Sequence, residues 1–391
     1  MRVTALATHG PLREAVRAAL TARGWDPERS RFAAAGLSQL ALLLEDIDES
    51  VREALVRWSA RSGVDVLTGD GWALVVGVAS RLAVLARPDR APAELHPVVA
   101  DLAQWFAGYA EPPHTWVIRD AELSLEEPVL VGILNVTPDS FSDGGRFAAL
   151  DDAVKQAEKL KAESCQLIDV GGESTRPGAA PVTTSEEIAR VVPAIQALVA
   201  RGLGPVSVDT RKAAVARAAL DAGAAVVNDV SGLAFDAELG KVVAAGGVGV
   251  ILMHMRGTPD AMDSLACYDH VAVDVARELR VAADRAEAAG VAADHIVLDP
   301  GFGFAKSPAQ NFRLLDELAS VTVLGFPVLV GPSRKRFLGA ATGRAVLDRD
   351  RATAVACALA WERGARLFRV HDPGPAREAL AVARALAGAD P

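Results

Sequence analysis

The sequence predicts an α/β protein in which a (β/α)8 barrel follows a small α+β domain. From residue 129 onward, eight short apolar runs alternate with segments of helical periodicity. Eight such units over roughly 250 residues match the barrel. Each run also ends in polar side chains, as barrel strands do where they form an active site. An open doubly wound sheet is the alternative, but no G-x-G-x-x-G follows the first run.

The predicted strands are apolar along nearly their whole length, which is typical of a parallel sheet covered on both faces. They span residues 129–136, 166–173, 205–210, 225–230, 248–255, 295–301, 327–334 and 366–372. Helical segments such as 151–163, 185–200, 211–223, 269–290 and 351–364 lie between them. We therefore expect one barrel domain over residues 114–391.

Residues 1–113 predict an accessory α+β domain, with helices over 11–23, 48–62 and 97–107. We expect the last helix to end at Gly108. Runs 64–68 and 72–78 flank Gly69-Asp70-Gly71 and predict a hairpin; an anion-binding loop is the weaker alternative. We expect the four tryptophans of the domain to pack in its core: Trp25, Trp58, Trp72 and Trp105.

The accessory domain contains no cluster of His, Cys or Asp and no phosphate-type glycine loop, so the sequence does not assign it a role. Residues 111–114 (EPPH) are the predicted linker. The next stretch, residues 115–125, alternates like a short hairpin that could plug one end of the barrel.

Composition narrows the class of protein. A net charge of −9 argues against nucleic-acid binding, which needs basic clusters. No apolar stretch is long enough for a membrane span, and the N-terminus does not resemble a signal peptide. Cys165, Cys267 and Cys357 have no metal-type spacing, so we expect buried thiols in a reducing compartment. These observations favour a cytoplasmic protein.

The polar groups at the strand ends predict a ligand pocket. Acceptors at Asp209, Asn228 and Asp299 suit a ligand edge rich in N–H donors. Lys335 offers donors, and Phe304 and Met253 could sandwich a flat ring. Arg176, Arg369 and His371 suit an anion such as phosphate, and the last two follow strand 8, near the usual phosphate corner of this barrel.

Less specific interpretations of these residues remain open. Asp209 could pair with Arg211, and His254 is more consistent with a satisfied rim or core histidine than with a ligand. Lys306 and Arg313 could form a solvated helix start. Of the neighbours Arg334 and Lys335, one is expected to point inward and the other outward. A Ser/His/Asp triad with Ser333 is conceivable, but no G-x-S-x-G elbow is present, and no motif predicts tightly bound zinc.

Motifs in a fixed order resemble the dihydropteroate synthase family over about residues 115–385. They are GILNVTPDSFSDGG (132–145), IDVGGESTRPGA (168–179), SVDT (207–210), NDVSG (228–232), LMHMRGTP (252–259), LDPGFGFAKS (298–307), GPSRKRFLG (331–339) and RVHD (369–372). The resemblance implies that 6-hydroxymethyl-7,8-dihydropterin pyrophosphate and p-aminobenzoate give 7,8-dihydropteroate and pyrophosphate. It also implies a homodimer as the assembly.

The resemblance assigns residue roles. Asp209, Asn228, Asp299 and Lys335 would bind the pterin, with Met253, Phe304 and Gly331 around its ring. Arg369, His371 and Asn135 would line the pyrophosphate side, with Mg²⁺ near Asn135. Phe141, Asp143, Thr175, Arg176 and Pro177 would lie on two mobile loops that close over the site. The p-aminobenzoate pocket would comprise Phe141, Thr175, Pro177 and Ser333, beside Lys335.

The implied mechanism needs no protein nucleophile. Pyrophosphate leaves first, and the arylamine attacks the resulting pterin-methyl cation. Catalytic roles fall to Asp143, Arg176, Lys335, Arg369 and His371, and loop closure excludes water. Residues 137–146 are accordingly expected to be the least ordered part of an unliganded barrel. Two alternatives are a pterin-dependent methyltransferase of the same superfamily and a non-catalytic pterin-binding protein.

Overall fold

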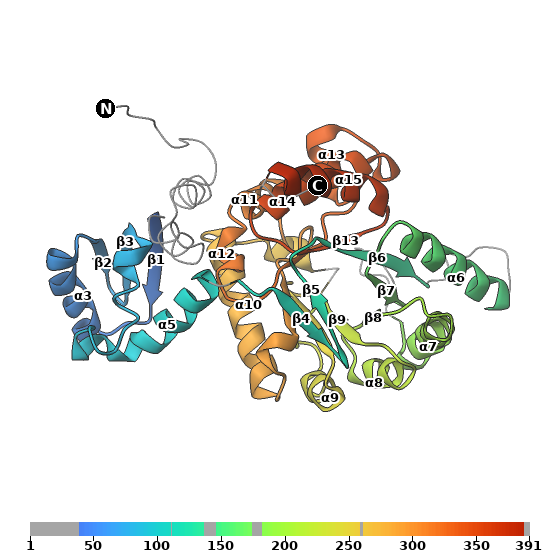
Figure 1. Cartoon of the computed structure of the whole chain (residues 1–391), viewed down its shortest axis with the longest axis horizontal. Helices are drawn as coiled ribbons and strands as arrows, with labels where there is room; N and C mark the ends of the chain where they lie inside the picture. The colour runs from blue at the N-terminus through green and yellow to red at the C-terminus, as the bar shows by residue number, and fades with distance from the viewer. Residues whose placement is uncertain (1–38, 111, 137–145, 174–181, 259–260, 387–391) are drawn as a thin grey trace, which may run out of the picture. The chain divides into compact units, whose positions relative to one another are not determined.

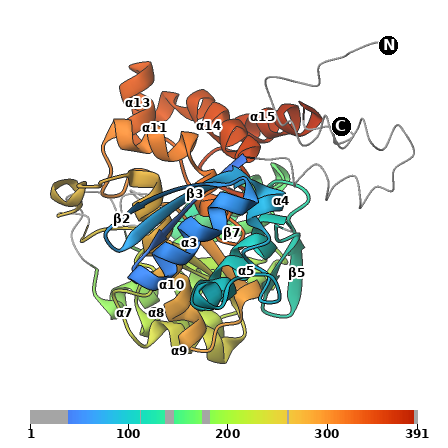
Figure 2. The same cartoon turned by 90° about the vertical axis from the view of Figure 1, so that its left-hand side faces the viewer.

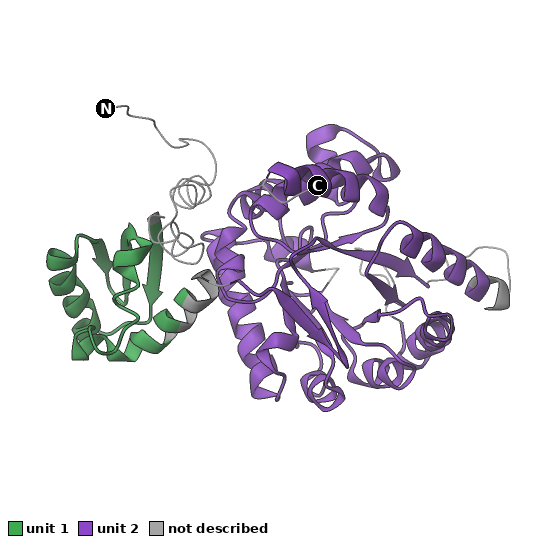
Figure 3. Ribbon diagram, viewed as in Figure 1, with its two compact units in different colours: residues 1–111 green, residues 112–391 purple. Residues whose placement is uncertain are grey.

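The computed structural model describes residues 39–110, 112–136, 146–173, 182–258 and 261–386. The chain divides into two compact units, residues 1–111 and 112–391 (Figure 3). Each unit has its own core of buried apolar residues and is described by itself.

The first unit contains a three-stranded antiparallel sheet of order β1-β3-β2. Its strands are β1 (Gln39–Glu45), β2 (Asp65–Gly69) and β3 (Trp72–Val78). Helix α3 (Glu49–Ser62) lies across one face of the sheet (Figure 2). The Asp48 side chain caps its first turn, and Gly63, with φ 66°, ends it in the left-handed conformation. Helices α4 (Ala79–Leu82), η1 (Ala93–Leu95) and α5 (His96–Ala110) complete the described part of this unit.

The predicted hairpin and the helices near 48–62 and 97–107 are confirmed, but three details differ. Strand β1 was not predicted, because apolar and polar residues do not alternate regularly along its sequence QLALLLE. Helix α5 continues through Gly108 to Ala110, so the predicted end was wrong. Trp72 is 40% exposed rather than in the core, because it begins β3 on the face away from Ala73 and Val75. Helix 11–23 and Trp25 lie outside the described residues, as does the Trp105 side chain.

The second unit is the predicted barrel, with its strands inside a ring of helices (Figure 1). Its parallel sheet has the order β11-β10-β9-β8-β7-β6-β13-β12, and a parallel bridge between Leu298 and Val328 closes the ring. The strands are β6 (Val129–Asn135), β7 (Leu167–Gly171), β8 (Val206–Asp209), β9 (Val226–Asp229), β10 (Gly249–Met253), β11 (Ile296–Asp299), β12 (Leu329–Val330) and β13 (Leu367–Val370).

Helices return the chain from the end of each strand to the start of the next. Their apolar faces form one continuous core with the outer faces of the strands. They are α6 (Arg146–Ala162), α7 (Thr184–Ala200), α8 (Ala213–Asp221), α9 (Leu239–Gly246), η3 (Met262–Leu265), α10 (Val271–Ala288), η4 (Ala293–His295), α11 (Pro308–Asp316), α12 (Ala319–Thr322), α13 (Arg336–Thr342), η5 (Val346–Asp348), α14 (Asp350–Glu362) and α15 (Pro373–Leu386).

The predicted hairpin closes the amino-terminal end of the barrel. It consists of β4 (Thr115–Ile118) and β5 (Ala121–Ser124). The fully buried Trp116 packs with residues at the strand starts, such as Val226 and Leu367, and donates a hydrogen bond to the His295 carbonyl (2.9 Å). The hairpin thus covers the end of the barrel opposite to the carboxyl ends of the strands, where barrels of this kind place their active sites.

Two of the three cysteines are buried as expected, Cys165 and Cys357, whereas Cys267 is exposed, which corrects that prediction. The thiol of Cys267 lies on the segment after η3, at the surface of the barrel. Among the described residues, no helix is long and apolar enough to cross a membrane.

Candidate active site at the carboxyl ends of the strands

Strand register brings the predicted polar residues into one layer. Asn135 is paired with Gly171, Gly171 with Asp209, and Asp209 with Asn228. Gly171 contributes no side chain, so the space above it stays open between its neighbours. A Cβ placed there would lie 3.4 Å from Asn135 Oδ1 and 3.7 Å from Asp209 Oδ2. Two oxygen acceptors therefore face each other across a glycine gap.

Arg369, on β13, connects two acids in this layer. Its Nε donates to Asp169 Oδ2 (2.6 Å) and its Nη2 donates to Asp209 Oδ2 (2.8 Å). Asn228 Nδ2 also donates to Asp169 Oδ2 (3.0 Å). The other oxygen of Asp169 is buried and has no hydrogen-bond partner among the described residues. The layer is thus a cluster of carboxylates around one guanidinium, with capacity to accept further hydrogen bonds.

Burial and neighbouring acids perturb Asp209. Removal from water raises the pKa of Asp209 to about 7, although Arg369 opposes the shift; Asp169 adds to it. A ligand that donates hydrogen bonds to this carboxylate would stabilise its charged form.

Asp299 ends β11 and begins a turn that carries Phe304. Its Oδ1 accepts a hydrogen bond from the Gly301 N–H (2.7 Å). Burial raises the pKa of Asp299 to about 6, against the opposing effects of this hydrogen bond and of Lys335. Lys335 Nζ lies 4.0 Å from the centre of the Phe304 ring, a cation–π contact.

An apolar wall adjoins these groups. Met253 and Phe304 are both buried and belong to one cluster with Val230 and Met262. Gly331 follows β12, and a Cβ there would meet the Arg369 Cβ at 3.9 Å, so it lies beside the guanidinium-bearing strand. A flat ring seated here would meet sulfur and aromatic carbon on its faces and carboxylates at its edge.

Ser333 and His371 form a pair at the strand 7–8 corner. The Ser333 hydroxyl accepts from the His371 backbone N–H (3.2 Å) and lies 2.9 Å from His371 Nδ1. The hydroxyl oxygen has two lone pairs, so Nδ1 either accepts from the hydroxyl or donates to it, and the first arrangement places the proton of a neutral imidazole on Nε2. Ser333 is buried, and this contact orients the imidazole ring rather than creating a nucleophile elbow.

The structure decides between the open alternatives. Asp209 pairs with Arg369 and not with Arg211, which lies near Glu173 (3.7 Å). Arg334 turns outward to Asp350 while Lys335 turns to Phe304, as expected for neighbours. His254 is buried with two partners, so the interpretation as a satisfied histidine holds.

The helix-start interpretation holds for only one of its two residues. Arg313 is solvated and pairs with Glu317 on its own helix. Lys306 is 2% exposed, which corrects that prediction. Sequence reasoning missed its network, and also the role of Asp169 as the second partner of Arg369. The signal for Asp169 was present, since an acid inside an apolar strand needs a buried partner.

Five predicted site residues lie outside the described residues: Phe141, Asp143, Thr175, Arg176 and Pro177. So does the predicted loop over 137–146 apart from its last residue. The described chain on either side of 174–181 is held by one group: Lys212 Nζ donates to Glu173 (2.8 Å) and to the Val182 carbonyl (2.6 Å). It also donates to the buried Glu187 (2.6 Å).

Comparisons with known proteins identify the family of this chain. A family model described as pterin binding enzyme matches residues 131–371. A dihydropteroate synthase of Synechocystis is 44% identical over 258 residues, which are 66% of this chain and 89% of that protein. One from Mycobacterium leprae is 44% identical over 276 residues, 69% and 97% of the two chains.

Solved structures give the same result. A Xanthomonas albilineans dihydropteroate synthase with 4-aminobenzoic acid has a TM-score of 0.66 and 43% identity, covering 71% of this chain and 99% of that one. The complex of the same organism's enzyme with 7,8-dihydropteroate has a TM-score of 0.64 and 41% identity, over 71% and 100% of the chains.

Proposed function

Because this chain belongs to the dihydropteroate synthase family of pterin-binding enzymes, we propose that its barrel joins 6-hydroxymethyl-7,8-dihydropterin pyrophosphate to p-aminobenzoate. The products are 7,8-dihydropteroate and pyrophosphate. The chain is a transferase of folate biosynthesis.

The observation that carries this function is the layer of acceptors beside an apolar wall. Asp209, Asn228 and Asp299 carry oxygen atoms at the carboxyl ends of their strands, and a pterin edge is rich in N–H donors. Met253 and Phe304 flank that edge, with Gly331 nearby and Lys335 over the Phe304 ring. Asp169 Oδ1, which has no partner in the described part of the chain, adds a buried acceptor to the same layer.

The pyrophosphate side is the strand 8 corner. His371, oriented by Ser333, would direct Nε2–H at the leaving group, and Arg369 would contribute its guanidinium. Asn135 Oδ1 and Asp209 Oδ2 border the same gap, and hard oxygen donors suit Mg²⁺, which usually binds through few protein ligands and substrate phosphates. We assign Asn135 as the protein ligand; bound Mg²⁺ would neutralise charge on the pyrophosphate. No cluster of three His, Cys, Asp or Glu capable of holding a metal occurs among the described residues.

The proposed mechanism is dissociative. Cleavage of the C–O bond to pyrophosphate leaves a pterin-methyl cation, whose charge the nearby carboxylates and Asp143 stabilise. Attack by the arylamine nitrogen then forms the C–N bond and releases a proton. Phe141, Thr175, Arg176 and Pro177, with Ser333 and Lys335, would enclose p-aminobenzoate and exclude water.

One assay separates this function from its two alternatives. The full chain is incubated with pterin pyrophosphate and p-aminobenzoate, and dihydropteroate and released pyrophosphate are measured. Equal amounts of both products support the proposal. Binding of pterin without turnover would indicate a non-catalytic protein. Methyl transfer from a methylfolate to a corrinoid protein, without dihydropteroate, would indicate the methyltransferase.

We also propose a homodimer, formed through α14 and α15. These helices pack against each other and leave Val355 (59%), Leu359 (42%) and Val382 (72%) exposed, an apolar set that a partner copy would cover. A cytoplasmic location is likewise a proposal, in keeping with three free cysteines. Sedimentation at several protein concentrations tests the dimer, and Val355→Asp should dissociate it.

A further inference from the structure

The turn from Gly301 to Phe304, which follows Asp299, is held from behind by two buried polar side chains. Lys306 Nζ donates to the carbonyls of Gly301 (3.1 Å) and Phe304 (3.0 Å). Asn311 Oδ1 accepts from the Gly303 N–H (2.7 Å), and its Nδ2 donates to the carbonyls of Lys306 and Ser307. Lys306 is 2% exposed and Asn311 is 1% exposed. The proposed reaction uses neither residue.

The third partner of Lys306 extends the network to α10. Lys306 Nζ lies 2.9 Å from His254 Nδ1, and His254 Nε2 lies 2.9 Å from Glu278 Oε2. An ammonium has donors only, so Nδ1 accepts and Nε2–H donates to the carboxylate. The buried lysine and the partly buried glutamate are therefore connected through a neutral histidine.

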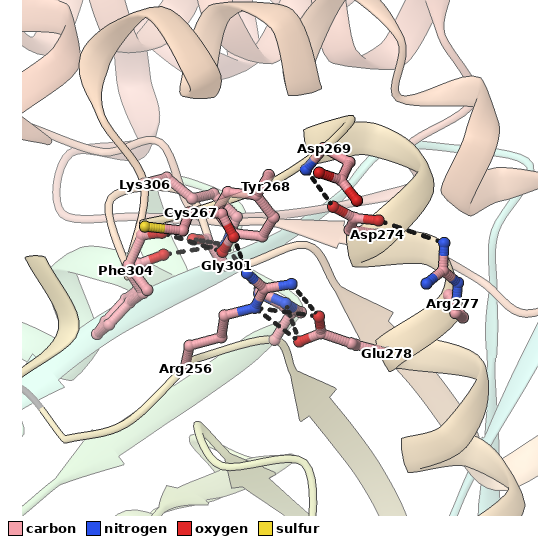
Figure 4. A network of polar contacts seen from close by, with 12 residues as sticks. Arg256, Cys267, Tyr268, Asp269, Asp274, Arg277, Glu278, Gly301, Phe304 and Lys306 are labelled. Carbon is pink, nitrogen blue, oxygen red and sulfur yellow. Dashed lines mark hydrogen bonds and ion pairs between the residues drawn. The ribbon is translucent and has the colours of Figure 1, made fainter. Parts of the chain in front are cut away.

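Arg256 closes the other end of the network (Figure 4). Its guanidinium pairs with the Glu278 carboxylate and donates to the Cys267 carbonyl. It also lies over the Tyr268 ring, 3.9 Å from its centre, and the Tyr268 hydroxyl donates to the Ala305 carbonyl (3.0 Å). The network thus contacts the chain at 301, 304 and 305.

The proposed pterin site rests on the other side of this turn. Gly301 donates to Asp299, and the Phe304 ring lies under the Lys335 ammonium. Two glycines make the close approach possible. A Cβ on Gly301, at φ 69°, would lie 2.0 Å from the His254 carbonyl oxygen, and one on Gly303 would lie 2.9 Å from Lys335 Cδ. A shift of the turn would therefore move Asp299, Phe304 and Lys335 together.

We propose that Lys306, connected through His254 to Glu278, is a positioning residue that sets the affinity of the site for the pterin by fixing the Gly301–Phe304 turn. The proposal rests on the function proposed above. Lys306 does not face the ligand side, since its Nζ is directed at Gly301, Phe304 and His254. Its effect reaches the pterin only through the carboxylate, the ring and the ammonium that the turn carries.

Stability alone does not account for this lysine. Burial is the main cause that lowers the pKa of Lys306, to about 7, so the charged form is disfavoured there, while Asp299 and Glu278 partly restore it. Apolar replacements of buried ionic groups are often neutral or stabilising. An apolar residue of similar length would satisfy packing at this position, but it would leave the carbonyls of Gly301 and Phe304 without their donor.

The test is Lys306→Met in the full chain, with Lys161→Met as the matched control. Lys161 Nζ also donates to two carbonyls, those of Gln166 (3.3 Å) and Gly204 (2.9 Å), but these lie at the opposite ends of the strands. For both variants, kcat, the KM of each substrate and the thermal unfolding midpoint are measured. Loss of the Lys306 donor is expected to displace the groups of the site by a fraction of an ångström. A displacement of that size corresponds to a change of about tenfold to a hundredfold in the kinetic constants.

Lys306→Met should raise the KM and the Kd for the pterin pyrophosphate by that factor. The KM for p-aminobenzoate should change by a clearly smaller factor, because Lys335 is the one group moved with the turn that also borders the proposed p-aminobenzoate pocket. Lys161→Met should leave both KM values unchanged. Equal changes in the two KM values, or a lower unfolding midpoint with an unchanged pterin KM, would show a purely structural role and overturn the proposal.

A second readout uses the acid side of the pH profile. The groups that lower the pKa of Asp299 are the Gly301 N–H and the cations Lys335, Arg369 and Lys306. Loss of the Lys306 charge should move the acid limb of kcat/KM for the pterin to higher pH, whereas Lys161→Met should not.

Glu278→Gln tests the connection through His254. It keeps the shape and the acceptor of the side chain but removes its charge. Its effect on the pterin KM should be largely absent when Lys306 is already methionine, so additive effects of the two substitutions would contradict the connection. If the wild-type chain gives no dihydropteroate, the proposed function fails. If the wild-type chain turns over normally and Lys306→Met has the same pterin KM, the function stands and the positioning role of Lys306 fails.

Discussion

At the scale of single residues, Arg369 has two roles, one in stability and one in the proposed reaction. It neutralises Asp169 and Asp209 in the structure, and it is proposed to assist departure of the pyrophosphate. Pterin N–H groups that donate to Asp209 would share this carboxylate with Arg369. Bound pterin would therefore add donors to the Asp209 carboxylate while Arg369 keeps its contacts with Asp209 and Asp169.

Arg369→Ala should lower kcat by roughly a hundredfold, as expected for loss of one preorganised contact to the leaving group. It should also lower the free energy of unfolding by about 3–5 kcal/mol, because two buried carboxylates lose their partner. Steady-state kinetics and urea unfolding measure the two effects.

Asp143→Ala is the comparison, with an expected loss of similar size in kcat. Near-wild-type turnover in either variant would remove that residue from the mechanism.

The pH dependence of the reaction should report the carboxyls of the pterin site. Burial raises the pKa of Asp209 to about 7 and that of Asp299 to about 6, and the ionised forms are the stronger acceptors for N–H donors. The kcat/KM for the pterin should therefore fall as pH is lowered from about 7 to 6. At saturating pterin the limb in kcat should lie at lower pH, because bound N–H donors favour the charged forms. A flat kcat/KM profile down to pH 5 would contradict these assignments.

The same shifts affect stability with the opposite sign. The pKa of both carboxyls is higher in the folded chain than in the unfolded chain, where an aspartate titrates at about 3.9. Acidification from about pH 7 to 4 thus protonates the folded form first, and these two groups make the fold more stable over that range.

Much of the site was predictable because an apolar run marks each strand and shows where it ends. Asp209, Asn228 and Asp299 could be placed at one rim from sequence alone. Alternation predicted that Arg334 and Lys335 point to opposite sides, but not which of them points inward. The partners of these residues could not be predicted. Arg369 reaches Asp169 across 200 positions of sequence. Lys306 is buried with His254, which is distant in sequence, and with the carbonyls of Gly301 and Phe304, and no local pattern encodes this contact. The strand β1 was missed for a related reason, since its burial is decided by pairing with β3.

At the scale of elements, the β4–β5 hairpin stabilises the barrel from the end opposite the active site. Trp116→Ala should lower the free energy of unfolding by about 3–5 kcal/mol, as is usual for a buried large-to-small substitution. Trp116→Phe keeps a ring but removes the donor to His295, so a loss of about 1–3 kcal/mol is expected. Both variants should keep the wild-type KM values at a temperature where they remain folded. A changed pterin KM would mean that the hairpin influences the site.

At the scale of the whole molecule, the region matched by the family model is shorter than the unit that folds. The match begins at residue 131, but the plug begins at Thr115. A chain beginning at Pro112 should fold and form dihydropteroate, whereas one beginning at Pro128 should expose the apolar strand starts and aggregate. Circular dichroism, sedimentation and the product assay compare them. An inactive but folded chain from Pro112 would show that residues 1–111 take part in catalysis.

Lys212 has a consequence for how this protein tolerates change. One ammonium holds the chain at Glu173 and at Val182, so the eight residues between them, 174–181, join two fixed points of the barrel. The entropy of joining fixed ends grows slowly with length, by about 0.6 kcal/mol for each doubling. We therefore expect insertions between these points to cost the barrel little stability. The same eight positions include the proposed site residues Thr175, Arg176 and Pro177, so changes there should alter the reaction more than the fold.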